Sequence, residues 1–116
     1  MWKDEAYLLD MLLTARKVVR FTQGLTGERF DGDELLQLGF LHLVQTIGEA
    51  AAKVSRGFRK AHPEIPWGDI IGMRNRLVHD YSNIDLDEVW DVVSEDVPAL
   101  ISQLEGLIPP DHIGGR

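Results

Sequence analysis

The fold is decided by the stretch Asp33–Ser55, which reads DELLQLGFLHLVQTIGEAAAKVS. Apolar residues recur in it every three or four positions, which is the spacing of one face of a helix. This first set consists of Leu36, Phe40, Leu43, Ile47, Ala50 and Val54. The pattern predicts a single long helix that begins at about Asp31 or Asp33 and ends at about Ser55.

The same stretch carries a second set of apolar residues on another side of the predicted helix. They are Leu35, Leu38, Leu41 and Val44. A helix that is apolar on more than one side must bury more than one side. We therefore expect one face to pack inside the chain's own bundle, and the other to be covered by another helix or by a second copy of the chain.

Before this stretch, a first helix is expected to begin near Asp4, which suits a helix N-cap, with Glu5 in the first turn. Its apolar stripe is formed by Leu8, Met11, Leu12, Ala15, Val18 and Val19. Gly24, Gly27 and Gly32 then predict a loop, because glycine interrupts helical patterns.

Beyond the stretch, the basic run Arg56–Pro63 ends the second helix. A third helix is predicted over roughly Trp67–His79. A fourth follows Asp85, which has capping-box spacing to Glu88. Pro98 lies inside the apolar pattern of this last helix and should kink it or divide it in two.

The whole pattern is helical, with no sustained strand alternation and no internal repeat. Long helices joined by short loops predict an all-α, up-and-down bundle of four or five helices, and the spare apolar face of the second helix favours a dimer. The 116 residues fit one domain. We expect this domain to cover residues 1–108 and residues 109–116 to form a loose tail.

Charge and composition narrow the function classes. The net charge of −7 argues against broad, non-specific coating of nucleic acid, because phosphates would be repelled, although a local basic cleft is compatible with it. The lack of cysteine excludes disulfides and thiolate metal sites. No apolar run is long enough to span a bilayer, and the N-terminus carries acids where a signal peptide carries cations. A cytoplasmic protein is expected.

Helix packing does not explain the segment Arg74–Tyr81, which reads RNRLVHDY. An arginine guanidinium binds phosphate oxygens with a permanent forked charge, and a histidine exchanges protons near neutral pH. Together Arg74 and His79 can cleave an RNA phosphodiester without a metal, since the 2′-hydroxyl supplies the nucleophile. The alternative is a solvated helix end, where the helix dipole favours cations.

The spacing within this segment sets a geometric condition. Five residues place Arg74 and His79 roughly 140° apart around a regular helix, so they do not converge on one small target. Either the helix distorts before His79, or a second copy of the chain completes the site. Asn75 lies four residues before His79 and is expected to orient the imidazole. Arg76 is expected to add substrate affinity or solubility.

The pattern Arg74-x4-His79-x-Tyr81 resembles the signature of HepT-like toxins, which belong to the HEPN superfamily. Further segments resemble the family's recurring pattern in the expected order. They are Ile47–Ala50, Ile65–Trp67, Ile70–Asn75, Leu77–Tyr81, Asp85 and Val89–Trp90. The resemblance covers nearly the whole chain except the tail.

This resemblance implies a dimerising helical bundle in which the motifs of both protomers line one cleft. It also implies a metal-independent ribonuclease toxin with Arg74 and His79 as catalytic residues and with no cofactor. The usual partner is a nucleotidyltransferase antitoxin of the MNT type. In studied members that antitoxin transfers AMP to the motif tyrosine, which corresponds here to Tyr81.

A second hypothesis is a non-catalytic helical module that binds a nucleotide or a partner protein and is paired with a nucleotidyltransferase. Many proteins share a fold without sharing its chemistry. RNA cleavage by the purified chain, and its loss on substitution of Arg74 or His79, would distinguish the two hypotheses.

Overall fold

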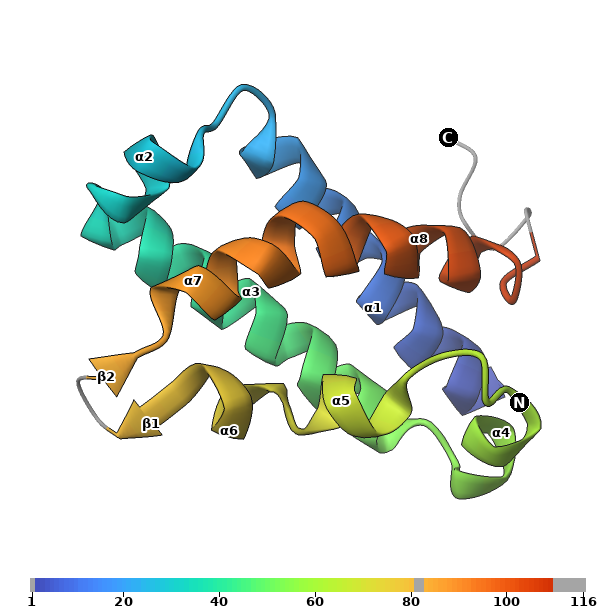
Figure 1. Cartoon of the computed structure of the whole chain (residues 1–116). Helices are drawn as coiled ribbons and strands as arrows, with labels where there is room; N and C mark the ends of the chain where they lie inside the picture. Colours follow the sequence, from blue (N-terminus) through green and yellow to red (C-terminus); the bar gives the residue numbers. More distant parts are fainter. Residues whose placement is uncertain (1, 81–82, 110–116) are drawn as a thin grey trace.

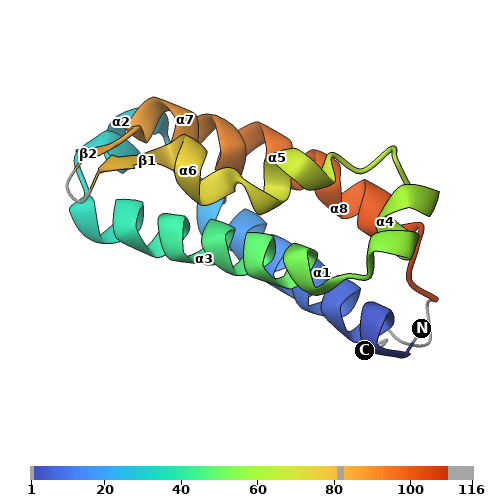
Figure 2. The same ribbon diagram turned by 90° about the horizontal axis from the view of Figure 1, so that it is seen from below.

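Two long antiparallel helices, α1 (Trp2–Thr22) and α3 (Glu34–Lys53), form the base of the molecule (Figure 1). The structure is a computed structural model that describes residues 2–80 and 83–109. Figure 2 shows a second layer, formed by α5 and α6 beside the continuous run of α7, η1 and α8, which lies over α1 and α3. The expected all-α bundle is confirmed.

The shorter elements join and complete these layers. They are α2 (Gly27–Asp31), α4 (Arg56–Ala61), α5 (Trp67–Ile71), α6 (Met73–Leu77), β1 (Val78–Asp80), β2 (Asn83–Ile84), α7 (Leu86–Asp91), the π-helical turn η1 (Val92–Asp96) and α8 (Val97–Glu105). Within residues 2–80 and 83–109, no helix combines the length and the apolar character that crossing a membrane would require. Most of the expected tail, residues 110–116, lies outside the described residues.

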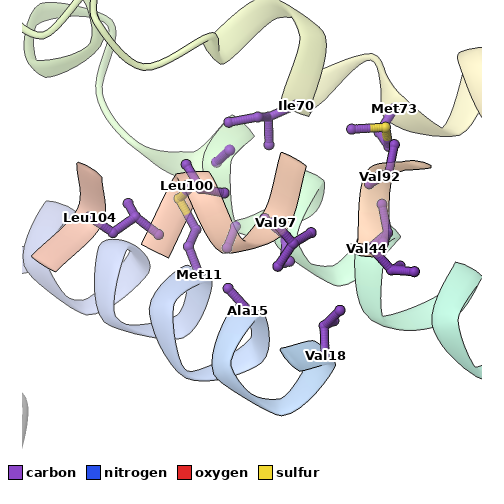
Figure 3. Packing of buried hydrophobic residues seen from close by; sticks show 14 of the residues in the cluster. Met11, Ala15, Val18, Val44, Ile70, Met73, Val92, Val97, Leu100 and Leu104 are labelled. Carbon is purple, nitrogen blue, oxygen red and sulfur yellow. The ribbon is translucent and has the colours of Figure 1, made fainter. Parts of the chain in front are cut away.

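The long helix α3 begins and packs as its sequence predicts. Asp33 caps it, because the Asp33 carboxylate accepts a hydrogen bond of 3.1 Å from the backbone N–H of Leu36. Its central position buries the seam residues Phe40, Ile47, Ala50 and Val54. The close-up in Figure 3 shows the core between α1, α3, α5, α6, η1 and α8, with Met11, Ala15, Val18, Val44, Ile70, Met73, Val92, Val97, Leu100 and Leu104 labelled.

The second apolar set of α3 divides into a buried half, covered by other helices of the chain as the first of the two expected alternatives requires, and an exposed half. Leu41 and Val44 are buried in the core of the same chain, because α5, α6 and α7 pack against that side of α3. Leu35 and Leu38 are 81% and 48% exposed. The spare apolar surface is therefore confined to the first turns of α3.

The predicted loop over residues 24–32 is partly wrong, because it contains the short helix α2. The Thr26 hydroxyl caps this helix by accepting a hydrogen bond of 3.2 Å from the Arg29 backbone N–H. Phe30 is fully buried, with its ring centroid 6.1 Å from that of Phe40 and 5.3 Å from that of Trp90. Burial of this single aromatic ring ties α2 to the bundle.

The basic run after α3 was expected only to end a helix, but it forms α4. Ser55 is the N-cap of α4, since its hydroxyl accepts from the Phe58 N–H at 3.2 Å. Asp4 lies in the first turn of α1, which begins at Trp2, and is not the cap of its own helix. Its carboxylate instead accepts hydrogen bonds from the backbone N–H and the hydroxyl of Ser55.

The last helical run begins at its predicted cap, and its hydrogen bonding changes just before Pro98. Asp85 caps α7 by accepting a hydrogen bond of 3.1 Å from the Glu88 N–H. Pro98 is the second residue of α8 and has no N–H to donate. It follows the π-helical turn η1, at whose end the Val97 N–H donates to the Val92 carbonyl five residues earlier. The α-helical hydrogen bonding is therefore interrupted just before Pro98, while the helical path from α7 to α8 stays continuous.

Candidate nuclease site

The third predicted helix stops before His79, so its predicted end is wrong. Gly72 separates α5 from α6, and α6 ends at Leu77. From Val78 the chain is extended, with φ −120° and ψ 110°, and β1 pairs antiparallel with β2. Of the two routes expected for bringing Arg74 and His79 toward one target, the structure contains the first, a backbone change between them.

Arg74, on α6, is one of the residues that line a groove between α3 and α5–α6. The groove has a volume of about 220 Å³ and is lined by Gln45, Gly48, Glu49, Ala52, Ile70, Ile71, Met73 and Arg74. Arg74 and Glu49 are both exposed, and within residues 2–80 and 83–109 Arg74 forms no ion pair. Its charge is therefore not neutralised by the described part of its own chain.

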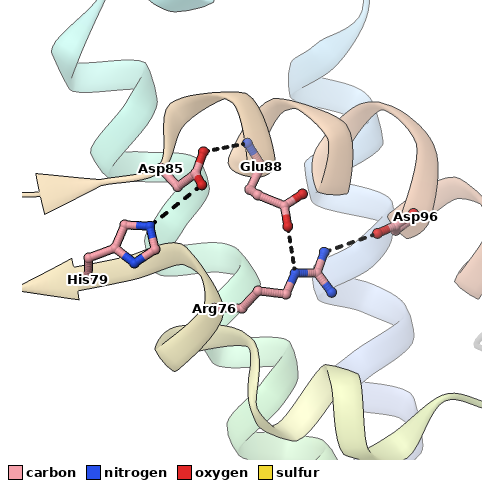
Figure 4. A network of polar contacts seen from close by, with 5 residues as sticks. All are labelled: Arg76, His79, Asp85, Glu88 and Asp96. Atoms are coloured by element: carbon pink, nitrogen blue, oxygen red, sulfur yellow. Dashed lines mark hydrogen bonds and ion pairs between the residues drawn. The ribbon is translucent and has the colours of Figure 1, made fainter.

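His79 lies on β1 with 54% of its side chain exposed. Figure 4 shows its Nε2 atom directed at Asp85, whose Oδ2 atom is 3.6 Å away. The other carboxylate oxygen of Asp85 accepts the capping hydrogen bond from Glu88 N–H. The imidazole is thus joined by one nitrogen to the start of α7, and its Nδ1 atom is on the other side of the ring.

Arg76 serves a different part of the molecule. It is two residues from Arg74, which corresponds to roughly 200° around a helix, so it faces away from that groove. Its guanidinium joins α6 to α7 and η1, with Nε 3.2 Å from Glu88 Oε2 and Nη2 3.4 Å from Asp96 Oδ2 (Figure 4). The Nε contact is ionic only, because the N–H direction makes no hydrogen bond with that carboxylate.

The two remaining predicted site residues are Asn75 and Tyr81. Asn75 is exposed, and the four-residue helical relation expected between it and His79 does not exist, because α6 ends at Leu77. The partner of the imidazole is Asp85, for which the sequence predicted a helix cap and a place in the family pattern but no role at the site. Tyr81 lies outside the described residues.

Two larger hollows, each of about 380 Å³, lie elsewhere. One lies between α5–α6 and η1–α8 over an apolar floor, and Arg76 and Asp96 line it. The other is almost wholly apolar and is lined by Phe21, Leu35, Leu36, Gly39, Phe40, His42 and Leu43. Neither is lined by Arg74 or His79. In the described ranges no cluster of three or more histidine and acidic side chains is arranged to hold a metal ion.

The family model described as ribonuclease HepT-like matches residues 11–107, which include Arg74, His79 and Asp85. The chain belongs to the HepT-like family. Because the match runs from α1 to the end of α8, it covers both layers of the bundle as well as the motif.

Relatives of this HepT-like chain cover most of its length. A protein of Methanocaldococcus jannaschii named as a putative RNase is 33% identical over 101 residues, which are 87% of this chain and 93% of that protein. A protein of Thermococcus cleftensis named as a probable ribonuclease HepT is 34% identical over 101 residues, again 87% of this chain and 92% of that protein. No solved structure matches the chain.

Proposed function

We propose that this chain is a metal-independent endoribonuclease toxin that acts in the cytoplasm as a homodimer, with Arg74 and His79 as its catalytic residues. The observation that carries the proposal is that both side chains are exposed on either side of a helix end, and that Arg74 has no ion-pair partner among the described residues. A packing role explains neither of them. Membership of the HepT-like family and the names of its relatives support the same activity.

The proposed reaction needs only a base, an acid and a phosphate clamp. The RNA 2′-hydroxyl loses its proton and attacks the adjacent phosphorus, and the bond to the 5′-oxygen breaks as that oxygen gains a proton. His79 takes or gives one of these protons, and Arg74 holds the phosphate and stabilises the charge that grows on it. The products are a 2′,3′-cyclic phosphate and a 5′-hydroxyl. Exposed Asn75 assists substrate binding, and Arg76 supports the site through α7.

The proposed dimer uses the apolar surface at the start of α3. The large exposed apolar side chains of the described chain are Leu13, Phe21, Leu35 and Leu38. Leu35 and Phe21 also line the apolar hollow at this end of the molecule. The β1–β2 hairpin with His79 lies at the same end, in both views of the bundle (Figures 1 and 2). Two copies paired here would bring two motifs together.

The proposed partner is a nucleotidyltransferase antitoxin of the MNT type that transfers AMP to Tyr81. Tyr81 follows β1, two residues after His79. A phosphate-bearing group there would place negative charge beside the proposed phosphate site and oppose RNA binding. Mass spectrometry after incubation with ATP and a nucleotidyltransferase of the MNT type should locate AMP on Tyr81. AMP found only on other residues would remove this role.

The proposal is tested by RNA cleavage with the purified wild type, Arg74→Ala and His79→Ala. Loss of a general acid–base group or of a charge-stabilising donor should lower the rate by about 10²-fold or more. Arg56→Ala, at an exposed arginine of α4, is the matched control and should retain wild-type activity. A wild type that binds nucleotides but leaves RNA intact would instead favour the non-catalytic binding module.

A further inference from the structure

We infer that Asp85 is a positioning residue for His79, and that it makes Nδ1 the atom that exchanges a proton with the RNA. The inference rests on the proposed ribonuclease function and adds to it a residue and an atom. Its basis is the contact between Asp85 Oδ2 and His79 Nε2, which lie 3.6 Å apart (Figure 4). A group that faces the ring by one nitrogen leaves the other nitrogen for the substrate.

Asp85 can orient the imidazole because Asp85 is itself held from two sides. Its backbone N–H donates to the Leu77 carbonyl at 2.8 Å, across the base of the β1–β2 hairpin. Its Oδ1 atom accepts from the Glu88 N–H at 3.1 Å. With the main chain and one carboxylate oxygen fixed, the second oxygen has a defined place beside the ring. The end of α6, the hairpin and the start of α7 therefore act as one frame for His79.

The charge of Asp85 suits the proposed chemistry. When the imidazole takes a proton from the 2′-hydroxyl it becomes positive, and a carboxylate at ion-pair distance stabilises that positive ring. The other charged groups around the ring come from both adjoining elements. Asp80 neighbours His79 on β1, exposed Asp87 lies in the first turn of α7, and Glu88 is paired with Arg76.

The double role of Asp85 provides variants that separate capping from positioning. Asn and Ser are both good N-caps, so Asp85→Asn and Asp85→Ser retain the cap of α7. Asn keeps the length of the side chain but loses the charge, and Ser loses both the charge and the reach to the ring. Asp87→Asn removes the same charge from the same turn and is the matched control for a general effect of charge on RNA binding.

We expect Asp85→Asn and Asp85→Ser to keep the wild-type melting temperature and KM for RNA, while kcat falls at least about tenfold. The upper limit is the loss of about 10²–10⁴-fold that accompanies removal of a general acid–base group. Asp87→Asn should keep the wild-type kcat. A wild type that cleaves RNA together with an Asp85→Asn variant of unchanged kcat would overturn this inference alone. A wild type without any cleavage would overturn the proposed function and this inference with it.

The contact also has a test that does not depend on catalysis. A double-mutant cycle of His79→Gln and Asp85→Asn, measured by urea denaturation, reports the coupling between the two side chains. The coupling should be favourable and of the size expected for a partly exposed charged pair. A coupling free energy of zero would show that Asp85 does not hold the ring.

Discussion

A Cβ atom added to Gly48 would lie 2.7 Å from the carbonyl oxygen of Ile70, closer than real Cβ atoms approach oxygen. Gly48 is in the middle of α3, and Ile70 is in α5. The two backbones are therefore in direct contact, and only glycine allows it. Gly48, Ile70 and Arg74 line the same groove, so this contact sets the width of the groove between α3 and α5.

Gly48→Ala should destabilise the protein by about 1–3 kcal/mol, because the added methyl group overpacks a contact made by rigid backbone. This loss exceeds the gain of up to about 1 kcal/mol that alanine normally brings to a helix. Urea denaturation followed by circular dichroism measures the difference. RNA cleavage by the proposed nuclease should fall as well, because α5 and α6 move together with Arg74.

Gly68→Ala is the matched control, since nothing lies within 4 Å of the corresponding Cβ position in α5. This substitution should leave stability unchanged or raise it slightly. Equal stability of Gly48→Ala and wild type would show that α3 and α5 are farther apart than the structure has them. The run of small residues that follows Gly48 in the sequence permits another helix to come close, but which helix does so depends on tertiary packing that no local pattern encodes.

The two halves of the second apolar set of α3 should respond in opposite ways to a charge. Leu41→Glu places a carboxylate in the core and should destabilise the fold by at least about 3 kcal/mol. The double variant Leu35→Glu/Leu38→Glu places charges on the exposed surface and should remain helical while losing the proposed dimer. Sedimentation velocity and thermal denaturation together separate the two effects.

A folded dimer of the Leu35→Glu/Leu38→Glu variant would show that two copies pair through another surface. The sequence pattern placed these four positions in one set, but steps of three residues drift by about 60° each around a helix, so Leu35 and Val44 lie on opposite sides. Val44 is four residues after Phe40 and three before Ile47, so it shares the side of these buried residues, whereas Leu35 does not. Helical spacing therefore separates the two ends of the set when the drift is taken into account.

Asp4 should make the stability of the fold depend on acid pH. The hydrogen bonds from the Ser55 hydroxyl and the Ser55 backbone N–H lower the pKa of the Asp4 carboxyl below its usual value. A carboxyl with a lowered folded-state pKa stabilises the fold fully above about pH 4, and this contribution is lost as the pH falls through the folded-state pKa. The stability difference between wild type and Asp4→Asn should therefore be largest at neutral pH and shrink toward pH 2.

Asp10→Asn removes an exposed carboxylate from the same helix, and its stability difference from wild type should change little over that range. Ser55→Ala should destabilise the fold by about 1 kcal/mol, because it removes the cap of α4 together with the hydroxyl that Asp4 binds. A difference between wild type and Asp4→Asn that is constant from pH 7 to pH 2 would contradict the contact. The sequence placed Asp4 at a helix start, but its partner lies 51 residues away.

For the segment Arg74–Tyr81 too, the residues could be predicted from the sequence, but their tertiary contacts could not. The residues Arg74 and His79 stand out from the sequence because arginine and histidine at a helix end suit phosphate chemistry. The backbone around them could not be predicted, because the helical spacing of residues runs through Leu77 and predicts a helix that continues to His79. The turn into β1 depends on the pairing of β1 with β2 and on Asp85. The contact between Asp85 and the His79 ring joins β1 to the start of α7, and local sequence patterns do not connect these two elements.

Substitution of Phe30 tests whether the five-residue helix α2 contributes to the stability of the fold. The ring is fully buried between α3 and α7, although it comes from a segment whose glycines predicted a loop. Phe30→Ala should destabilise the fold by about 3–5 kcal/mol, as removal of a buried aromatic ring does. Phe30→Leu keeps most of the apolar surface and should have a smaller effect. Arg29→Ala, at an exposed neighbour, should stay within about 0.5 kcal/mol of wild type. A Phe30→Ala variant as stable as Arg29→Ala would mean that α2 is not part of the core. The segment would then behave as the loop that its glycines predict.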